Sequence, residues 1–285
     1  MTSRPTRIVD AHVHLWDPAH TDWYPYLGGQ QDIGLGDVTG MARRFDVATY
    51  RAEADGWNVE KLVNVAAATG PHSVDETLEM DARTDGRPDA LIGGLPGVDS
   101  AEAIAAIDRQ TAASRFRGVR PMGAPLGWVP PAEVLEALRE RRLIFELLAR
   151  PDNLAEAAAR LEGADDLTVV VEHTGWPGSD SSEERAVWAD GLRALAGLGP
   201  NIHCKLSSIV GATGSMTAES FAPWINAAIE LFGVERCFFA SNFPVDGLHG
   251  TLDQLWSAYA ELTSVEDQTT VDALFATNAE RLYRC

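Results

Sequence analysis

The stretch Ile8-Val-Asp-Ala-His-Val-His14 begins as an apolar run and ends in two histidines. Side chains two residues apart on a strand point to the same face, so the imidazoles of His12 and His14 are expected to converge on one point. Two convergent imidazoles suit a divalent metal ion or a polarised carbonyl group. A His-x-His pair alone is weak evidence, because a solvated or structural role explains it equally well.

Similar short runs recur along the chain, and longer stretches with apolar residues at helical spacing separate them. The strand-like runs are Ile8–His14, Lys61–Ala67, Leu91–Pro96, Phe116–Met122, Leu143–Ala149, Thr168–Thr174, Ile202–Ser208 and Cys237–Phe243. The helix candidates are Val74–Thr84, Ala101–Ala113, Pro131–Arg141, Asn153–Leu161, Glu183–Ala196 and Ala218–Phe232. Buried strands that alternate with helices are typical of a parallel sheet. Eight of them in 285 residues predict one domain, a (β/α)8 TIM barrel spanning residues 1–285.

A doubly wound open sheet is the alternative fold. No Gly-rich nucleotide-binding loop follows any of the strand-like runs, which argues against the nucleotide-binding form of that fold. Residues 16–50 contain many Gly, Asp and aromatic residues and are too long for an ordinary loop between strand and helix. We expect them to form a lid over the mouth of the barrel.

Composition and charge exclude several classes of partner. A hydrophobic content of 45% is enough for a substantial core, and a net charge of −19 repels nucleic-acid phosphates and anionic membrane surfaces. The three cysteines contain no Cys-x-x-Cys pair, no apolar run approaches a membrane span, and the N-terminus is polar. We therefore expect a cytoplasmic protein with a small-molecule substrate and no nucleic-acid or membrane partner. The oligomeric state stays open, with a homodimer as one alternative because barrels of this kind often pair through their outer helices.

Polar residues stand at or near the ends of several predicted strands. Barrel enzymes carry their chemistry at the carboxyl ends of the strands, and an unpaired buried charge is costly, so these residues are the candidate site. Glu146 and Lys205 either contact a ligand or neutralise each other, and Trp16 and Tyr24 either line the pocket or pack in the core. The candidates by position are His12, His14, Arg120, Glu146, His173, Lys205 and Asn242.

Several blocks of the sequence together resemble a known family. They are Ile8–Trp16 (IVDAHVHLW), Phe116–Arg120 (FRGVR), Val171–Pro177 (VEHTGWP), Cys204–Ser207 (CKLS), Ala240–Val245 (ASNFPV) and Thr277–Tyr283 (TNAERLY). Their order and spacing are similar to those of the amidohydrolase-2 branch of the amidohydrolase superfamily. That branch includes sugar-acid lactonases, pyrone-dicarboxylate lactonase and decarboxylases of aromatic or related acids. This sequence is most similar to the lactonase group, which implies a hydrolase.

The resemblance implies roles for the matching residues. His12, His14 and His173 are expected to bind one divalent metal, zinc or manganese, or to polarise the substrate carbonyl without a metal. Arg120 is expected to hold an anionic group of an organic-acid or sugar-acid lactone. Other residues expected to bind the substrate are Glu146, Lys205, Trp16 and Tyr24.

The chain departs from the family at the end of strand eight. An aspartate that activates water is usual there, and this chain has Asn242, whose amide cannot accept a proton near neutral pH. Asn242 is then expected to orient water or donate to an oxyanion, while Asp246 or Glu146 supplies the base. The alternatives are a lyase such as a decarboxylase, an isomerase, or a binding protein without catalysis.

Overall fold

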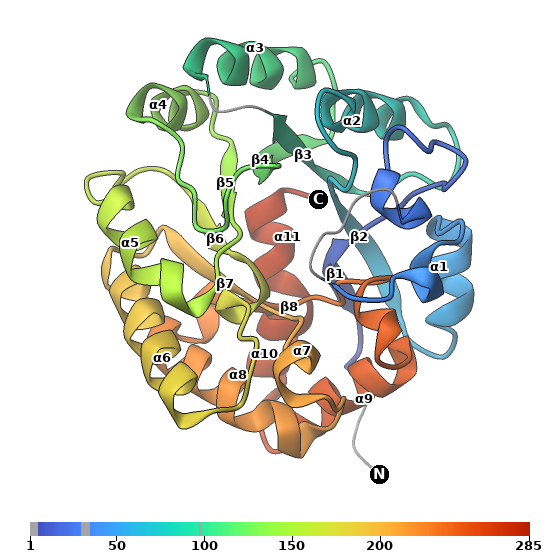
Figure 1. Ribbon diagram of the computed structural model, residues 1–285. Coiled ribbons are helices and arrows are strands. Elements are labelled where there is room, and N and C mark those ends of the chain that lie inside the picture. The colour runs from blue at the N-terminus through green and yellow to red at the C-terminus, as the bar shows by residue number, and fades with distance from the viewer. Residues whose placement is uncertain (1–4, 30–34, 97–98) are drawn as a thin grey trace.

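Eight parallel strands form a barrel in which each strand pairs with the next along the chain (Figure 1). The computed structural model describes residues 5–29, 35–96 and 99–285. The strands are β1 (Ile8–Val13), β2 (Val59–Val65), β3 (Ala90–Pro96), β4 (Phe116–Met122), β5 (Ile144–Leu147), β6 (Val169–Val171), β7 (Ile202–Leu206) and β8 (Cys237–Phe239). Each lies within or overlaps one of the eight predicted runs, because short β-branched segments buried on both faces are read reliably from sequence.

The ring closes where the end of β1 meets the segment that follows β8. Val13 forms a parallel bridge with Phe243, and the His14 amide donates a hydrogen bond to the Phe243 carbonyl at 2.8 Å. The backbone N–H of Asn242 in turn donates a hydrogen bond to the His12 carbonyl at 2.8 Å. The predicted (β/α)8 barrel is therefore confirmed, and closure itself brings Asn242 beside the two histidines of β1.

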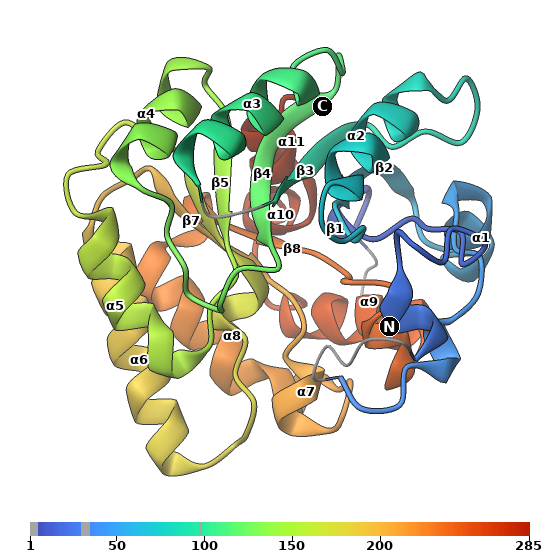
Figure 2. The same ribbon diagram turned by 45° about the horizontal axis from the view of Figure 1, so that its top comes forward.

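Helices surround the strands, as Figures 1 and 2 show from two directions. They are α1 (Val47–Glu53), α2 (His72–Ala82), α3 (Ser100–Gln110), α4 (Ala132–Glu140), α5 (Pro151–Leu161), α6 (Ser182–Gly197), α7 (Val210–Thr213), α8 (Ala218–Phe232), α9 (Leu252–Leu262), α10 (Gln268–Asp272) and α11 (Asn278–Tyr283). The six predicted helices correspond to α2–α6 and α8. No helix in the described part of the chain is long and apolar enough to cross a membrane.

The helix starts follow from capping residues. Thr217 and Thr251 form capping boxes with Ser220 and Gln254 at the starts of α8 and α9, which satisfies amide groups that the first turn leaves unpaired. The same signal was available in the sequence for α9, a helix that the periodicity did not predict. Capping and periodicity together define these helices better than either alone.

The long segment after β1 is anchored at both ends. Trp16 and Phe45 exchange two backbone hydrogen bonds of 2.9 Å, and α1 begins at Val47, so the last residues of the predicted 16–50 loop are helical. Residues 30–34 of this segment lie outside the described residues. Tyr24 and Tyr26 are buried, with the Tyr26 hydroxyl donating to the Ala67 carbonyl at 3.0 Å. The segment packs on the loop after β2, and its role as a lid stays a prediction.

The C-terminal helix α11 lies at the centre of the ring in Figure 1. Tyr283 at its end is fully buried, and its ring packs edge-on against Phe238 of β8. The Tyr283 hydroxyl donates to Glu146 of β5 at 2.5 Å. The helix therefore brings a polar group to the base of the site as well as apolar surface.

Candidate active site at the carboxyl ends of the strands

Three histidines from two strand ends meet in the barrel mouth. The Nε2 atoms of His12 and His14 lie 3.2 Å apart, as their spacing along β1 predicted, and the His173 ring centroid lies 4.6 Å from that of His12. His14 donates from Nδ1 to the Val65 carbonyl at 2.8 Å, which leaves Nε2 with a lone pair. Burial lowers the pKa of all three imidazoles, that of His14 to about 3, so they are neutral near pH 7.

A residue with left-handed backbone geometry follows shortly after each of three strands. The φ angles are 55° at His173 after β6, 54° at Ser208 after β7 and 54° at Asn242 after β8. Such angles are uncommon outside glycine, although asparagine and histidine tolerate them, and they collect at functional sites. Each turns the chain sharply out of its strand. At β6 this turn breaks the alternation of side chains, so Glu172 and His173 both face the site.

Glu172 is a site residue that the sequence reasoning missed. Its carboxylate lies 3.7 Å from Arg120 Nη1, 3.8 Å from His12 Nδ1 and 3.8 Å from His173 Nε2. Strict alternation would place it on the opposite face from His173, and only the φ angle at His173 reveals otherwise. In the sequence, the one indication of its role is that a charged residue directly precedes His173 at the end of a buried strand.

Glu172 and Arg120 both have unused hydrogen-bonding capacity. Neither Glu172 oxygen, nor Nε or Nη1 of Arg120, has a hydrogen-bond partner among the described residues, although all four atoms are buried. Burial raises the pKa of Glu172, and the nearby Arg120 charge opposes that rise. Buried polar groups are nearly always satisfied in folded proteins, so these atoms indicate a site built to receive a ligand or ion.

Asp246 supplies a carboxylate next to the residue that replaces the family aspartate. Its Oδ1 accepts hydrogen bonds from Asn242 Nδ2 at 2.8 Å and from Ser208 Oγ at 2.9 Å, while Oδ2 has no partner among the described residues. Burial raises the pKa of Asp246 to about 7, and the two hydrogen bonds partly offset this rise. The Asp246 carboxyl group, four residues after Asn242, is thus joined to the site by its hydrogen bond with the Asn242 side chain.

Glu146 and Lys205 pair with each other beneath the histidines. Both are fully buried, and Lys205 Nζ donates to Glu146 Oε2 at 2.6 Å. The other Glu146 oxygen accepts the Tyr283 hydroxyl, and Lys205 Nζ lies 3.2 Å from His12 Nδ1. The mutual neutralisation considered from the sequence is what the structure contains. Their direct contact with a ligand stays a prediction, as does a catalytic role for Glu146.

The two aromatic candidates differ in their surroundings. The Trp16 ring stacks on His14 with centroids 5.9 Å apart and an interplanar angle of 8°. The Tyr24 hydroxyl donates to the buried carboxylate of Glu76 at 2.8 Å, and Glu76 also accepts the amides of Ala67 and Ala68. Trp16 therefore contacts the histidine cluster, whereas Tyr24 fixes the loop after β2.

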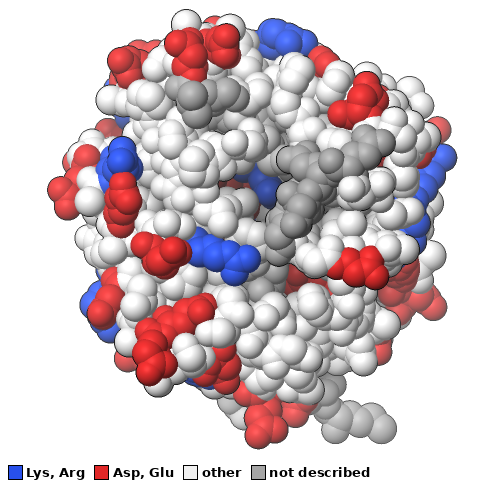
Figure 3. Space-filling view, viewed as in Figure 1, with Lys and Arg blue, Asp and Glu red and all other residues white. Residues whose placement is uncertain are grey.

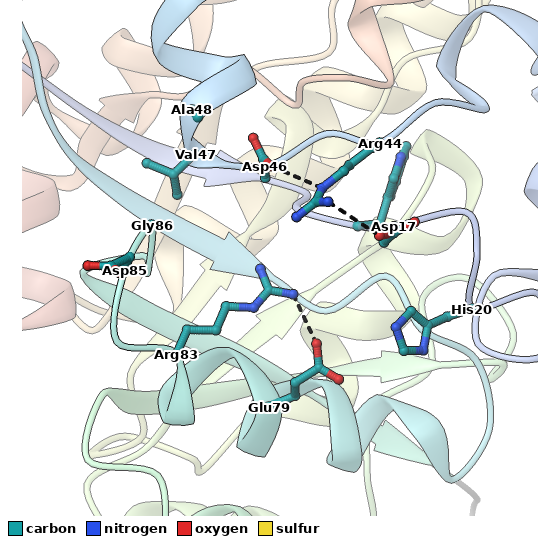
Figure 4. A pocket seen from close by; sticks show the side chains of 11 residues that line it. Asp17, His20, Arg44, Asp46, Val47, Ala48, Glu79, Arg83, Asp85 and Gly86 are labelled. Atoms are coloured by element: carbon teal, nitrogen blue, oxygen red, sulfur yellow. Dashed lines mark hydrogen bonds and ion pairs between the residues drawn. The ribbon is translucent and has the colours of Figure 1, made fainter.

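A cavity of about 500 Å³ lies between the loop after β1, the start of α1 and the end of α2 (Figure 4). Trp16 lines it, but none of the three clustered histidines does. Its basic groups already have partners, since Arg44 pairs with Asp46 and Arg83 pairs with Glu79. The unsatisfied buried polar atoms of Glu172 and Arg120 lie in the barrel mouth and not in the lining of this cavity. We assign the chemistry to the mouth.

The residues present fit a divalent metal ion. Donor atoms of His12, Glu172 and His173 all lie within 4.8 Å of one another. The 3.2 Å between Nε2 of His12 and Nε2 of His14 is close to the separation of roughly 3.3 Å expected for two imidazoles on one tetrahedral zinc. Glu172, whose carboxylate has no hydrogen-bond partner among the described residues, is a fourth donor beyond the three predicted histidines.

Comparisons with known proteins agree with this architecture. An uncharacterised protein of Sinorhizobium fredii is 28% identical to this chain, covering 97% of it and 98% of the relative. An L-fucono-1,5-lactonase of Burkholderia ambifaria is 27% identical, covering 89% and 86%. The crystal structure of a zinc-bound amidohydrolase from Burkholderia multivorans superposes with a TM-score of 0.80 at 22% identity, covering 98% and 99% of the two chains. The amidohydrolase family model Amidohydro_2 matches residues 9–285, so the predicted family and its hydrolase class are confirmed, and the chain belongs to the amidohydrolase-2 family.

Proposed function

We propose that this protein hydrolyses a small lactone of an organic or sugar acid, with Asp246 as the general base. The observation that carries the proposal is the Asp246 carboxyl, which is buried, has one oxygen held by Asn242 and Ser208, and has the other oxygen free. A base with a pKa near 7 is well matched to neutral pH. The lactonase names of two Burkholderia relatives support the choice of reaction.

The other residues have distinct tasks in this reaction. Neutral His12, His14 and His173 surround the position of the lactone carbonyl, and Arg120 offers unpaired donors to an anionic group of the substrate. Asn242 orients the attacking water with its free Oδ1 while its amide nitrogen holds Asp246. A zinc or manganese ion held by the histidines and Glu172 would polarise the carbonyl as a Lewis acid. The water proton passes to Asp246 Oδ2.

Activity on a panel of sugar-acid lactones and pyrone carboxylates, run in water enriched in oxygen-18, tests the proposal. We expect turnover with one solvent oxygen in the product and a loss of activity of about 10²- to 10⁴-fold in Asp246→Asn. Asp190→Asn is the matched control, because Asp190 is exposed and pairs only with Arg193 on α6. Turnover without solvent oxygen would overturn the hydrolase and favour the lyase or isomerase.

A further inference from the structure

A second arginine, Arg150, lies near the mouth with no hydrogen bond to its side chain from the described residues. Arg150 follows β5 and directly precedes α5, and its guanidinium carbon lies 4.2 Å from the centroid of the Trp176 ring. It makes no side-chain hydrogen bond or ion pair with any described residue and is partly exposed. Arg120 on β4 also has unused hydrogen-bond donors, because its Nε and Nη1 have no hydrogen-bond partner among the described residues although Nη1 lies 3.7 Å from Glu172. Arg43 and Arg44, in the loop after β1, are ion-paired.

The neighbouring loop is built to seat this guanidinium. Trp176 supplies an aromatic face, which attracts a cation. A Cβ atom at Gly178 would lie 2.8 Å from Arg150 Nη1, so the missing side chain leaves room for the guanidinium. Glu184 holds the loop by accepting the amides of Gly178 and Ser179 and the Ser179 hydroxyl. The charge of Arg150 also helps to lower the pKa of Glu184, but its guanidinium forms no hydrogen bond with the described residues. Arg150 is therefore held in place with hydrogen-bond donors still available.

The seat adjoins the candidate active site. The Trp176 ring centroid lies 6.0 Å from that of His173, so one aromatic ring joins the histidine cluster to Arg150. Figure 3 shows a hollow near the centre of the face over the strands, with basic atoms inside it, while acidic side chains lie mostly toward the edge. In a protein with a net charge of −19, a basic centre is a local attraction for anions.

We propose that Arg150 is a specificity-determining residue that binds a second anionic group of the substrate. The inference rests on the proposed function, in which Arg120 holds the first anionic group. Two arginines with unused hydrogen-bond donors, one on β4 and one after β5, then select a dianionic acid over a monoanionic one. The free edge of each guanidinium can form two parallel hydrogen bonds with a carboxylate, which a lysine cannot do.

Calorimetric titration with linear carboxylates tests this without needing the true substrate. The probes are glutarate and adipate, compared with the monocarboxylates pentanoate and hexanoate. We expect Arg150→Met to weaken dicarboxylate binding about tenfold or more and monocarboxylate binding by about twofold at most. Gly178→Ala should have a smaller effect of the same kind, because the new Cβ displaces the guanidinium. Arg120→Met should weaken both classes of probe.

Arg185→Met is the matched control. Arg185 also stacks on a tryptophan, Trp224, at 4.6 Å, but it is ion-paired with Asp180, so probe binding should not change. A wild-type protein with no preference for dicarboxylates, or a preference that survives Arg150→Met, would overturn the inference. Loss of lactone hydrolysis as the assigned reaction would leave this titration intact, so the two proposals fail separately.

Discussion

Replacing Asp246 with asparagine separates its catalytic role from its structural role. The substitution keeps the side-chain shape, and the remaining oxygen can still accept the hydrogen bonds from Asn242 and Ser208. The amide cannot accept a proton from water, so activity should fall about 10²- to 10⁴-fold. In the wild type, kcat/KM should rise through a pH of about 7 and level above it, because the base must be ionised.

The same substitution should stabilise the protein at high pH. Burial raises the folded-state pKa of Asp246 to about 7, against about 3.9 in an unfolded chain. Below pH 4 the group is protonated in both states and costs nothing. Above pH 7 it is ionised in both, and the difference in pKa lowers the free energy of unfolding by about 4 kcal/mol. Between pH 5 and pH 8 this amounts to a loss on the order of 2–3 kcal/mol that Asp246→Asn avoids.

Urea unfolding of both proteins at pH 5 and pH 8, beside the activity profile, measures the two effects. Other buried carboxyl groups contribute equally to both proteins, so the difference between the proteins isolates Asp246. A variant that keeps wild-type activity would refute Asp246 as the base. A stability difference that does not change with pH would refute the raised pKa of its carboxyl group.

Three further changes test other parts of the site. Asn242→Asp places a second carboxylate beside Asp246, and repulsion between the two charges should raise the pH at which kcat/KM increases to above pH 7. Higher activity than the wild type at pH 7 would instead show that residue 242 is the natural position for the base. Lys205→Met leaves the Glu146 carboxylate buried without its cation, so the free energy of unfolding measured with urea should fall by about 3–5 kcal/mol. The double variant that also carries Glu146→Gln should recover part of this loss. Plasma mass spectrometry of protein purified without chelators should find near one zinc or manganese ion per chain. The His12→Ala, His14→Ala double variant should contain much less, and an equal metal content would exclude His12 and His14 as ligands.

The barrel and its first histidine pair were predictable from local pattern. Short apolar runs separated by helical periodicity predict parallel strands, and a period of two along β1 predicts that His12 and His14 share a face. The 3.2 Å between their Nε2 atoms agrees with that geometry. The sequence also identified Asn242 as a departure from the family pattern and offered Asp246 and Glu146 as alternative bases.

Tertiary structure decided which polar side chains meet and which are already satisfied. The left-handed φ at His173 breaks the alternation of β6, so that His173 enters the site beside its neighbour Glu172, and no residue type predicts that angle. Whether Glu146 and Lys205 face a ligand or each other depends on the packing of β5 against β7 and on Tyr283 from the far end of the chain. Local periodicity assigns a side chain to a face, whereas partners, burial and the resulting pKa values depend on residues brought together only when the barrel closes.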